Sequence, residues 1–486
     1  MRLSRNLAIL LTLLLTPALS AETTVSSIIG NNMVLQRNAP VVLWGWDDAG
    51  TRVTVKIGGS SANATAADDG SWSVSLPAMK AGGPHAISIS GSSTLAIKNV
   101  LVGEVWFCSG QSNMEWTVSR SNNPQEEIAA ANHPTIRHIK FPHQTADKPQ
   151  SKTKTQGWTE TTPQTVGGYT GVGYFFALNL QKELEVPIGL IGCNWGGTRI
   201  EPWTPPVGFQ SVPALKDISD NLANFPTKND NGQVQHQTPL AIYNAMVHPI
   251  LKYRFKGALW YQGESNNGEG MLYHEKMKAL ILGWRKVFDN PKMPFHFVQL
   301  APYKYNRPEA LPGIWEAQLK TLSIKNTGMA VTVDIGNVKD IHPRNKQEVG
   351  RRLALWSLTK DYGCDVGPYS GPLFLKADQK EGKDSITVWF QKETTGGLKA
   401  SDGEDKPLTH FEISGKDGTW HPATVTIVYG RLPVRVWSRW KRDHLIVNSE
   451  NVKEPVAVRF GWNELAEPNL VNRAGLPASP FRTKSD

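Results

Sequence analysis

The segment EVWFCSGQSNMEW, residues 104–116, joins an apolar run to a run of small polar residues. Its first half is typical of a strand covered on both faces, because apolar residues follow one another without alternation. Such a strand ordinarily ends in a turn, yet this one continues into Ser109, Gln111, Ser112 and Asn113. The pattern therefore predicts a buried strand whose carboxyl end presents polar side chains.

An alternation of strands and helices follows, within residues 100–362. Expected strands lie at 187–197, 256–265, 295–300 and 328–334, and expected helices at 173–185, 240–251, 271–288 and 345–362. This alternation predicts an α/β domain with a parallel sheet covered by helices on both faces. In open sheets of this type, ligands bind at the carboxyl ends of the strands.

The flanking regions consist of short strand-like segments separated by turns rich in Gly and Asp. They predict an N-terminal β-sandwich-like domain over residues 21–99, and a C-terminal β domain with a terminal segment over residues 363–486. Residues 204–238 have little periodicity and are expected to form an ordered loop over the α/β domain. A chain of 486 residues is long enough for two or three domains.

Residues 1–20 have the pattern of a secretory signal peptide. Arg2 and Arg5 precede an apolar run from Leu7 to Leu15, and small residues follow before Ala21. The run is too short to span a bilayer, and no later stretch is long and apolar enough. We expect cleavage near Ser20–Ala21, a mature form without membrane insertion, and a secreted or periplasmic location.

The composition argues against several classes of protein. With 40% hydrophobic and 20% charged residues, the chain is core-forming rather than disordered. Its formal net charge is +9, and its basic residues are scattered along the chain without blocks of like charge. No nucleic-acid partner is therefore expected. The sequence does not indicate an oligomeric state.

The cysteines are too few for a disulfide scaffold or a structural zinc site. They are Cys108, Cys193 and Cys364, which we expect to be mostly buried thiols, with a Cys108–Cys193 pairing as the alternative. No set of His, Cys and Asp residues has the spacing of metal ligands. Neither a metal nor a cofactor is therefore expected.

Polar residues follow three of the expected strands and recur in a fourth segment. The segments are FCSGQSN at 107–113, CNWGGT at 193–198, WYQGESN at 260–266 and VDIGNVKDIHPRNK at 333–346. In a parallel sheet these segments would converge at one edge. That edge is where we expect a substrate to bind.

The four segments contain the groups that acyl transfer requires. Ser112 is a candidate nucleophile and His342 a candidate base. Donors for the developing oxyanion would be the Ser112 backbone N–H, an N–H of Gly196 or Gly197, and the side-chain amide of Gln262.

Each of these residues also has a purely structural interpretation. Ser112 could be a helix N-cap, with Glu115 completing a capping box. A histidine before proline, such as His342, is more often structural, a Gly-Gly pair is usually a turn, and Glu264 could pair with a buried amide. The coincidence of four polar junctions at one edge favours the catalytic interpretation.

The same segments resemble a known family. GQSNMEW, NWGGTRIEPW, WYQGESN and DIHPRNKQEVGRRLA, with MVLQRNAPVVLWGW and GLPASPFRT, resemble the sialate O-acetylesterase-type carbohydrate esterases of the SGNH hydrolase superfamily. The resemblance extends over nearly the whole mature chain. It implies a flavodoxin-like α/β core with a parallel sheet, flanked by N-terminal and C-terminal β-sandwich-like modules. It also implies a serine esterase that removes O-acetyl groups from sialic acids or from plant-wall polysaccharides such as xylan or xyloglucan. The matching serine and histidine are Ser112 and His342.

The acid of a catalytic triad is not identified by this resemblance. The superfamily's last block is Asp-x-x-His, but here Lys339 stands at the Asp position and Asp340 lies two residues before His342. The usual Asn of the third block is replaced by the Gln-Gly-Glu run. Glu264 could be the acid, as the glutamate of that run is in related acetylxylan esterases, or Asp340 could be the acid through a tight turn.

The expected partner is an acetylated carbohydrate. The candidate substrate-binding residues are Gln111, Asn113, Arg199 and Trp203, and the tryptophans beside the motifs are Trp116, Trp203 and Trp260. An indole ring can pack against a sugar, although any single tryptophan is more often part of a core. The motifs do not separate sialic acid from hemicellulose, because loops such as 204–238 would select the sugar.

The alternative function is a non-catalytic carbohydrate-binding or scaffold protein built on the same fold. The intact Ser112, His342 and two candidate acids argue against it.

Overall fold

The computed structural model describes residues 22–379, 383–403, 405–430 and 441–483. The predicted signal peptide, residues 1–20, lies outside these ranges. Within them, no helix combines the length and the apolar character needed to cross a membrane. In the same ranges, no three His, Cys, Asp or Glu side chains are grouped so that they could hold a metal ion.

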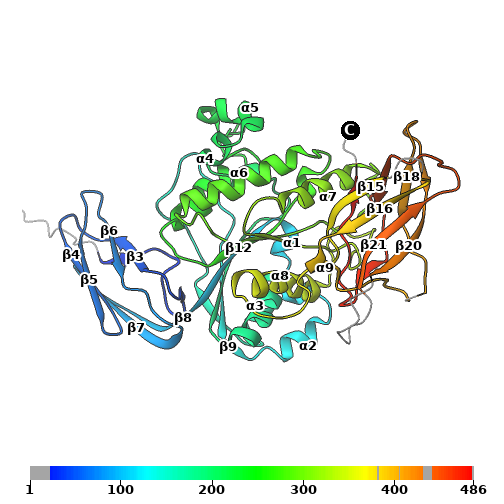
Figure 1. The fold of residues 1–486 in the computed structure, drawn as a ribbon. Helices are drawn as coiled ribbons and strands as arrows, with labels where there is room; N and C mark the ends of the chain where they lie inside the picture. The colour runs from blue at the N-terminus through cyan, green and yellow to red at the C-terminus, as the bar shows by residue number, and fades with distance from the viewer. Residues whose placement is uncertain (1–21, 380–382, 404, 431–440, 484–486) are drawn as a thin grey trace, which may run out of the picture.

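A large mixed sheet forms the centre of the molecule (Figure 1). Its central strands are β8 (Thr94–Gly110), β9 (His133–Lys140), β10 (Trp158–Thr161), β11 (Ile188–Asn194), β12 (Gly257–Tyr261), β13 (Phe295–Val298) and β14 (Thr327–Ala330). They lie in the order β10-β9-β11-β8-β12-β13-β14, and all neighbours are parallel except β10 and β9. Every residue of β11, β12, β13 and β14 is buried, which explains why these strands are mostly apolar and do not alternate with exposed polar residues.

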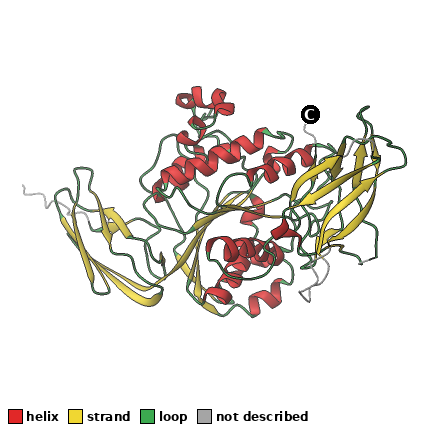
Figure 2. Cartoon of the chain, in the orientation of Figure 1, coloured by secondary structure: helices red, strands yellow, loops and turns green. Residues whose placement is uncertain are grey.

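Helices cover both faces of this sheet (Figure 2). On one face lie α3 (Gly171–Leu184) and α8 (Lys346–Asp361), and on the other lie α6 (Leu272–Val287) and α7 (Ala310–Thr321). Thr170 and Asn345 cap α3 and α8, because their side-chain oxygens accept backbone N–H groups of the first turns. The shorter helices are α1 (Ser112–Glu115), α2 (Pro124–Ala129), α4 (Pro206–Gln210), α5 (Lys216–Asp220) and α9 (Lys392–Thr395).

The segment 204–238, expected to be a loop, contains the short helices α4 and α5. Helix α4 packs closely on α6, since a Cβ at Gly208 would lie 2.3 Å from the carbonyl oxygen of Ala279. Helices of one or two turns are too short to produce a readable apolar period. The segment 240–251, expected to be an ordinary helix, forms a π-helical turn at Tyr243–Val247 and a 3₁₀ turn at His248–Ile250.

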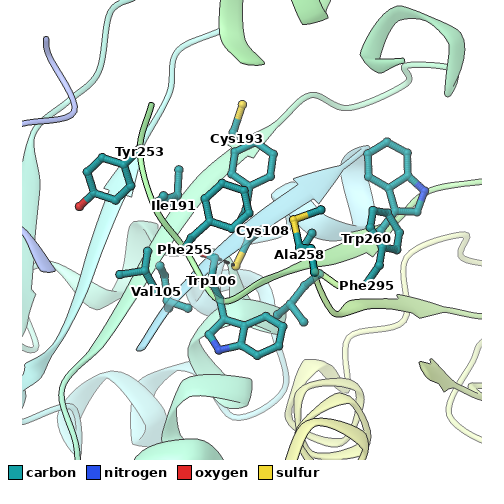
Figure 3. Packing of buried hydrophobic residues seen from close by; sticks show 14 of the residues in the cluster. Val105, Trp106, Cys108, Ile191, Cys193, Tyr253, Phe255, Ala258, Trp260 and Phe295 are labelled. Carbon is teal, nitrogen blue, oxygen red and sulfur yellow. Dashed lines mark hydrogen bonds between the residues drawn. The ribbon is translucent and has the colours of Figure 1, made fainter. Parts of the chain in front are cut away.

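The core around the central strands is rich in aromatic side chains (Figure 3). It includes the two buried thiols Cys108 and Cys193, which are free. The alternative of a disulfide between them is wrong. In the parallel pairing of β8 and β11, Cys108 stands opposite Gly192, whereas Cys193 stands opposite Ser109. This one-residue offset directs the two sulfur atoms to opposite faces of the sheet.

The N-terminal module contains two sheets. One sheet consists of β1 (Thr24–Val25), β3 (Val41–Trp46) and β6 (Ser71–Leu76); the other consists of β5 (Ser60–Thr65), β4 (Arg52–Ile57), β7 (Gly82–Ser90) and β8, with β2 (Val34–Gln36) also pairing with β8. Strand β8 is therefore common to this module and to the central sheet. Its amino-terminal half pairs with β7, and residues 104–110 pair with β11 or β12. The predicted boundary between residues 99 and 100 thus lies inside one continuous strand.

The C-terminal module has its own hydrophobic core and lies at the opposite end of the molecule from the N-terminal module (Figure 1). One sheet has the order β15 (Phe374–Gln379), β16 (Ser385–Phe390), β21 (Lys441–Asn448), β20 (Thr424–Gly430). A second has the order β19 (Trp420–Pro422), β18 (Phe411–Ser414), β22 (Ala457–Phe460), β24 (Phe481–Arg482), and β17 (Leu398–Ala400) pairs with β23 (Leu470–Asn472).

Candidate active site

The four polar segments meet at the carboxyl edge of the central sheet. Strand β8 lies between β11 and β12, and Gly110 is in register with both Asn194 and Tyr261. The backbone N–H of Gln111 donates to the carbonyl of Tyr261, so the chain beyond β8 is joined to the end of β12. The fourth segment arrives from β14 and brings His342 to this edge, where Nε2 lies 2.9 Å from Ser112 Oγ.

A sharp turn at Gly110 positions Ser112. Gly110 has φ +134°, a conformation that favours glycine, and a Cβ there would lie 2.2 Å from the carbonyl oxygen of Tyr261. Ser112 then begins the single-turn helix α1 (Ser112–Glu115). The structural interpretation of Ser112 as an N-cap is wrong, because Gln111 is the cap residue and no side chain caps the helix.

This turn leads to a prediction for Gly110→Ala. We expect it to destabilise the fold by about 3 kcal/mol or more, because the substitution adds a backbone clash to the strain of the positive φ. Gly157→Ala is the matched control, since Gly157 has φ +78° but a Cβ added there would meet no atom within 4 Å. Thermal unfolding should separate the two variants. Equal melting temperatures would mean that β8 and β12 separate easily at this point.

His342 is held by an aromatic stack. Its ring lies on that of Trp116, with 4.7 Å between centroids and 19° between planes. Trp116 is 7% exposed, and both His342 and the guanidinium of Arg120 lie over its ring, so it does not offer a free face to a sugar. Burial lowers the pKa of His342, and the positive charge of Lys346 lowers it further. The imidazole is therefore neutral at neutral pH, the form in which Nε2 can accept a proton.

The two candidate acids have different partners. Asp340 Oδ1 accepts the backbone N–H of His342 at 3.0 Å and lies 3.5 Å from its Nδ1. Glu264 Oε1 instead accepts from Asn113 Nδ2 at 2.5 Å. Burial raises the pKa of Glu264, and the bond from Asn113 only partly offsets this. Asp340 is thus the carboxylate that contacts the imidazole.

Asn113 links several parts of the site. Its Nδ2 also donates to the carbonyl of Ile341 at 3.0 Å, and its Oδ1 accepts from Lys346 Nζ at 2.5 Å. The residue is 1% exposed. Asn113 is a candidate substrate-binding residue, but in the structure both ends of its amide are bound within the protein. Sequence analysis missed Lys346, because a lysine in the first turn of a helix ordinarily lies at the surface.

The candidate oxyanion donors differ in availability. The side-chain amide of Gln262 already donates to the Thr198 carbonyl and to Asn266 Oδ1, so it is not free to donate to an oxyanion in this structure. The Gly196 N–H is already bound, at 2.7 Å, to Glu115 Oε2. In the described part of the chain, no acceptor is found for the N–H groups of Ser112 and Gly197. Gly197 is exposed, with φ +75° and no neighbour within 4 Å of a Cβ position.

Two other substrate-binding candidates have structural roles. Gln111 is 3% exposed, and its Oε1 accepts the backbone N–H of Ser265 at 3.2 Å. Trp203 is fully buried and donates its indole N–H to Thr198 Oγ1. Both side chains are therefore directed into the protein in this structure. Trp260, at 1% exposure, is also a core residue.

Arg199 remains accessible at this edge. Its side chain is 37% exposed and forms ion pairs with Glu201 and Glu269. It also donates to the carbonyl of Ser265, and in this way connects the segments that follow β11 and β12.

An aromatic stack that the sequence did not reveal lies next to these residues. Trp195 is stacked between His143, at 4.4 Å and 4°, and His236, at 4.9 Å and 11°. His143 also lies 2.8 Å from Glu115, whose other oxygen binds Gly196. Burial would raise the pKa of Glu115, but these hydrogen bonds outweigh it, and the pKa is lowered. His236 comes from the segment 204–238, which therefore packs against Trp195, the residue that follows β11.

Comparison with known proteins identifies the family. Residues 102–358 match the family described as carbohydrate esterase, sialic acid-specific acetylesterase. The sialate O-acetylesterase of Homo sapiens is 32% identical over 83% of this chain and 82% of its own length. That of Pongo abelii is 30% identical over 94% of this chain and 91% of its own length.

A solved structure agrees with this result. The crystal structure of a carbohydrate acetylesterase from Xanthomonas citri is 36% identical, covers 96% of this chain and 100% of its own, and has a TM-score of 0.85. The chain therefore belongs to the carbohydrate esterase family of sialic acid-specific acetylesterases, and it is a carbohydrate O-acetylesterase, as its motifs predicted.

Proposed function

We propose that the protein is a serine esterase of the SGNH type, in which Ser112 is acylated by the acetyl group of a carbohydrate. The observation that supports it most directly is the 2.9 Å separation between Ser112 Oγ and His342 Nε2. This distance permits proton transfer from the hydroxyl to the ring. The parallel strands of the central sheet suit the flavodoxin-like core of that superfamily.

The first half of the reaction forms the acyl-enzyme. His342 Nε2 takes the proton of Ser112 as Oγ attacks the carbonyl carbon of the acetyl group. Asp340, 3.5 Å from Nδ1, stabilises the imidazolium and favours the tautomer with its proton on Nδ1. Collapse of the tetrahedral intermediate breaks the bond to the sugar oxygen, which receives the proton from His342 Nε2. The sugar leaves as an alcohol.

The second half repeats these steps with water. His342 removes a proton from the water molecule as its oxygen attacks the acetyl carbon. Collapse of this second tetrahedral intermediate breaks the bond between the acetyl carbon and Ser112 Oγ, which takes the proton from Nε2. The products are the free serine and acetic acid, which loses its proton to the solvent as acetate. The N–H groups of Ser112 and Gly197 are the proposed donors to the oxyanion in both halves, because neither has an acceptor among the described residues.

The sugar is proposed from the relatives, and a substrate panel tests it. The curated relatives are sialate O-acetylesterases, and the Xanthomonas citri protein is a carbohydrate acetylesterase. We expect acetate release from a chromogenic acetyl ester and from at least one of O-acetylated sialic acid, acetylated xylan and acetylated xyloglucan. Release from none of the four by folded protein would contradict the proposed reaction. A non-catalytic scaffold role is not favoured, because the family is one of esterases.

The same proposal includes export. The signal-type pattern of residues 1–20 supports action outside the cytoplasm after cleavage near Ser20–Ala21. N-terminal sequencing of protein recovered from the periplasm or the medium would test this, since an intact Met1 would contradict it.

A further inference from the structure

A fully buried lysine lies behind the catalytic pair. Lys346 is the first residue of α8, and its side chain has no exposed surface. Its Nζ donates to Asn113 Oδ1. The Nδ2 of Asn113 donates in turn to Glu264 Oε1 and to the carbonyl of Ile341. One amide thus connects the lysine, a buried carboxylate and the residue directly before His342.

The surroundings of Lys346 compensate for its lost hydration. Its Nζ lies 5.0 Å from the ring centroid of Tyr261 and 5.8 Å from that of Trp116, distances at which aromatic faces attract a cation. Glu264 provides the opposite charge through Asn113, and its Oε2 has no hydrogen-bond partner in the part of the chain that is described. A buried charge without a partner is strongly disfavoured, so each of the two depends on the other.

The charged groups around His342 come from three elements. Asp340 lies on its own loop, Lys346 on α8, and Arg120 on the turn after α1, where its guanidinium lies over the ring of Trp116. The groups that face Lys346 are Glu264 and Asp340. Burial lowers the pKa of Lys346 to about 7, with the two carboxylates opposing the shift. Below that pH, a second positive charge on the neighbouring imidazole is disfavoured.

We propose that Lys346 is a positioning residue that keeps His342 unprotonated in mildly acidic solution, and that Glu264 is its counter-charge rather than the acid of the triad. This inference rests on the proposed serine mechanism, in which only the neutral imidazole can accept the proton of Ser112. The bond from Asn113 to the Ile341 carbonyl also fixes the loop that carries the ring. Lys346 and Glu264 touch neither the reacting hydroxyl nor the imidazole; they act through Asn113 and through charge.

The pH dependence of kcat/KM on a chromogenic acetyl ester tests the inference. In Lys346→Met the positive charge is absent, so the pKa of His342 should rise and the acid limb should move to higher pH by roughly one unit. The matched control is Lys360→Met, which removes an exposed lysine from the other end of the same helix. Its acid limb should coincide with that of the wild type. If the acid limb of Lys346→Met coincided with that of the wild type, the proposal would be overturned.

Two further variants distinguish the loss of the charge of Lys346 from misfolding of the protein. Lys346→Met leaves Glu264 buried without compensation, whereas the double variant with Glu264→Gln removes both charges and should melt at a higher temperature than the single one. Its acid limb should remain displaced. Glu264→Gln alone keeps the shape of the side chain and lowers the pKa of Lys346, so it should displace the limb in the same direction, with a plateau kcat within about tenfold of that of the wild type. If the acid limbs of the double variant and of Glu264→Gln both coincided with that of the wild type, the proposal would be contradicted. Absence of hydrolysis by the wild type would instead reject the esterase mechanism.

Discussion

Replacing Ser112 with alanine should lower kcat by roughly 10⁴-fold or more. The expected loss is large because Ser112 Oγ, 2.9 Å from His342 Nε2, would be the atom that bonds to the acetyl carbon. The fold should be unaffected, since α1 uses no side-chain cap and its turn is set by Gly110. Steady-state hydrolysis of a chromogenic acetyl ester measures the loss, and a thermal melt verifies folding.

Ser109→Ala is the matched control for this experiment. Ser109 belongs to the same polar run, but it is fully buried and its Oγ has no hydrogen-bond partner among the described residues. Its variant should hydrolyse the ester at close to the wild-type rate. A folded Ser112→Ala protein with near-normal turnover would remove the proposed nucleophile.

Replacing Asp340 with asparagine should lower kcat on the order of 10²–10⁴-fold. Asparagine retains an oxygen that can accept the backbone N–H of His342, so the loop should keep its shape. The lost charge would no longer stabilise the imidazolium that forms when Ser112 attacks. The side chain of Asp340 is 34% exposed and lies 3.5 Å from Nδ1. The loss of kcat should therefore be smaller than for a fully buried acid, near the lower end of this range.

Glu264→Gln is the decisive comparison for the same question. Glu264 bonds to Asn113, so its variant should keep the plateau kcat within about tenfold of the wild type. A large loss in Glu264→Gln combined with a small loss in Asp340→Asn would reverse the assignment of the acid. Normal kcat in both variants and in the double variant would mean that Ser112 and His342 act as a dyad.

Strand ends are the most informative feature of the sequence. The meeting of Ser112 and His342 can be anticipated because parallel strands bring their carboxyl ends to one edge, whatever the length of chain between them. The same reasoning fails for Gln262 and Trp203. It places a residue at the edge, but it does not say whether the side chain turns outwards to the substrate or inwards to the protein.

Lys346 shows a second limit. The residues that make its burial possible, Asn113 and Tyr261, lie on other segments of the chain, and Asn113 is 233 positions away. Nothing local distinguishes this lysine from a solvated one. Likewise, the switch from alternating to continuous apolar residues near residue 100 resembles a domain boundary. It marks the point where β8 passes from a sheet with one exposed face into one covered on both.

The continuity of β8 constrains how the protein can be rebuilt. The strand is 17 residues long, roughly 55 Å at about 3.3 Å per residue, and it ends two positions before Ser112. The N-terminal module is therefore joined to the nucleophile by a continuous hydrogen-bonded strand instead of a flexible linker. Exchanging that module for another would require interrupting β8, so the module cannot be replaced as an independent domain. Any glycan that touched both the module and the catalytic edge would meet two surfaces at a fixed separation.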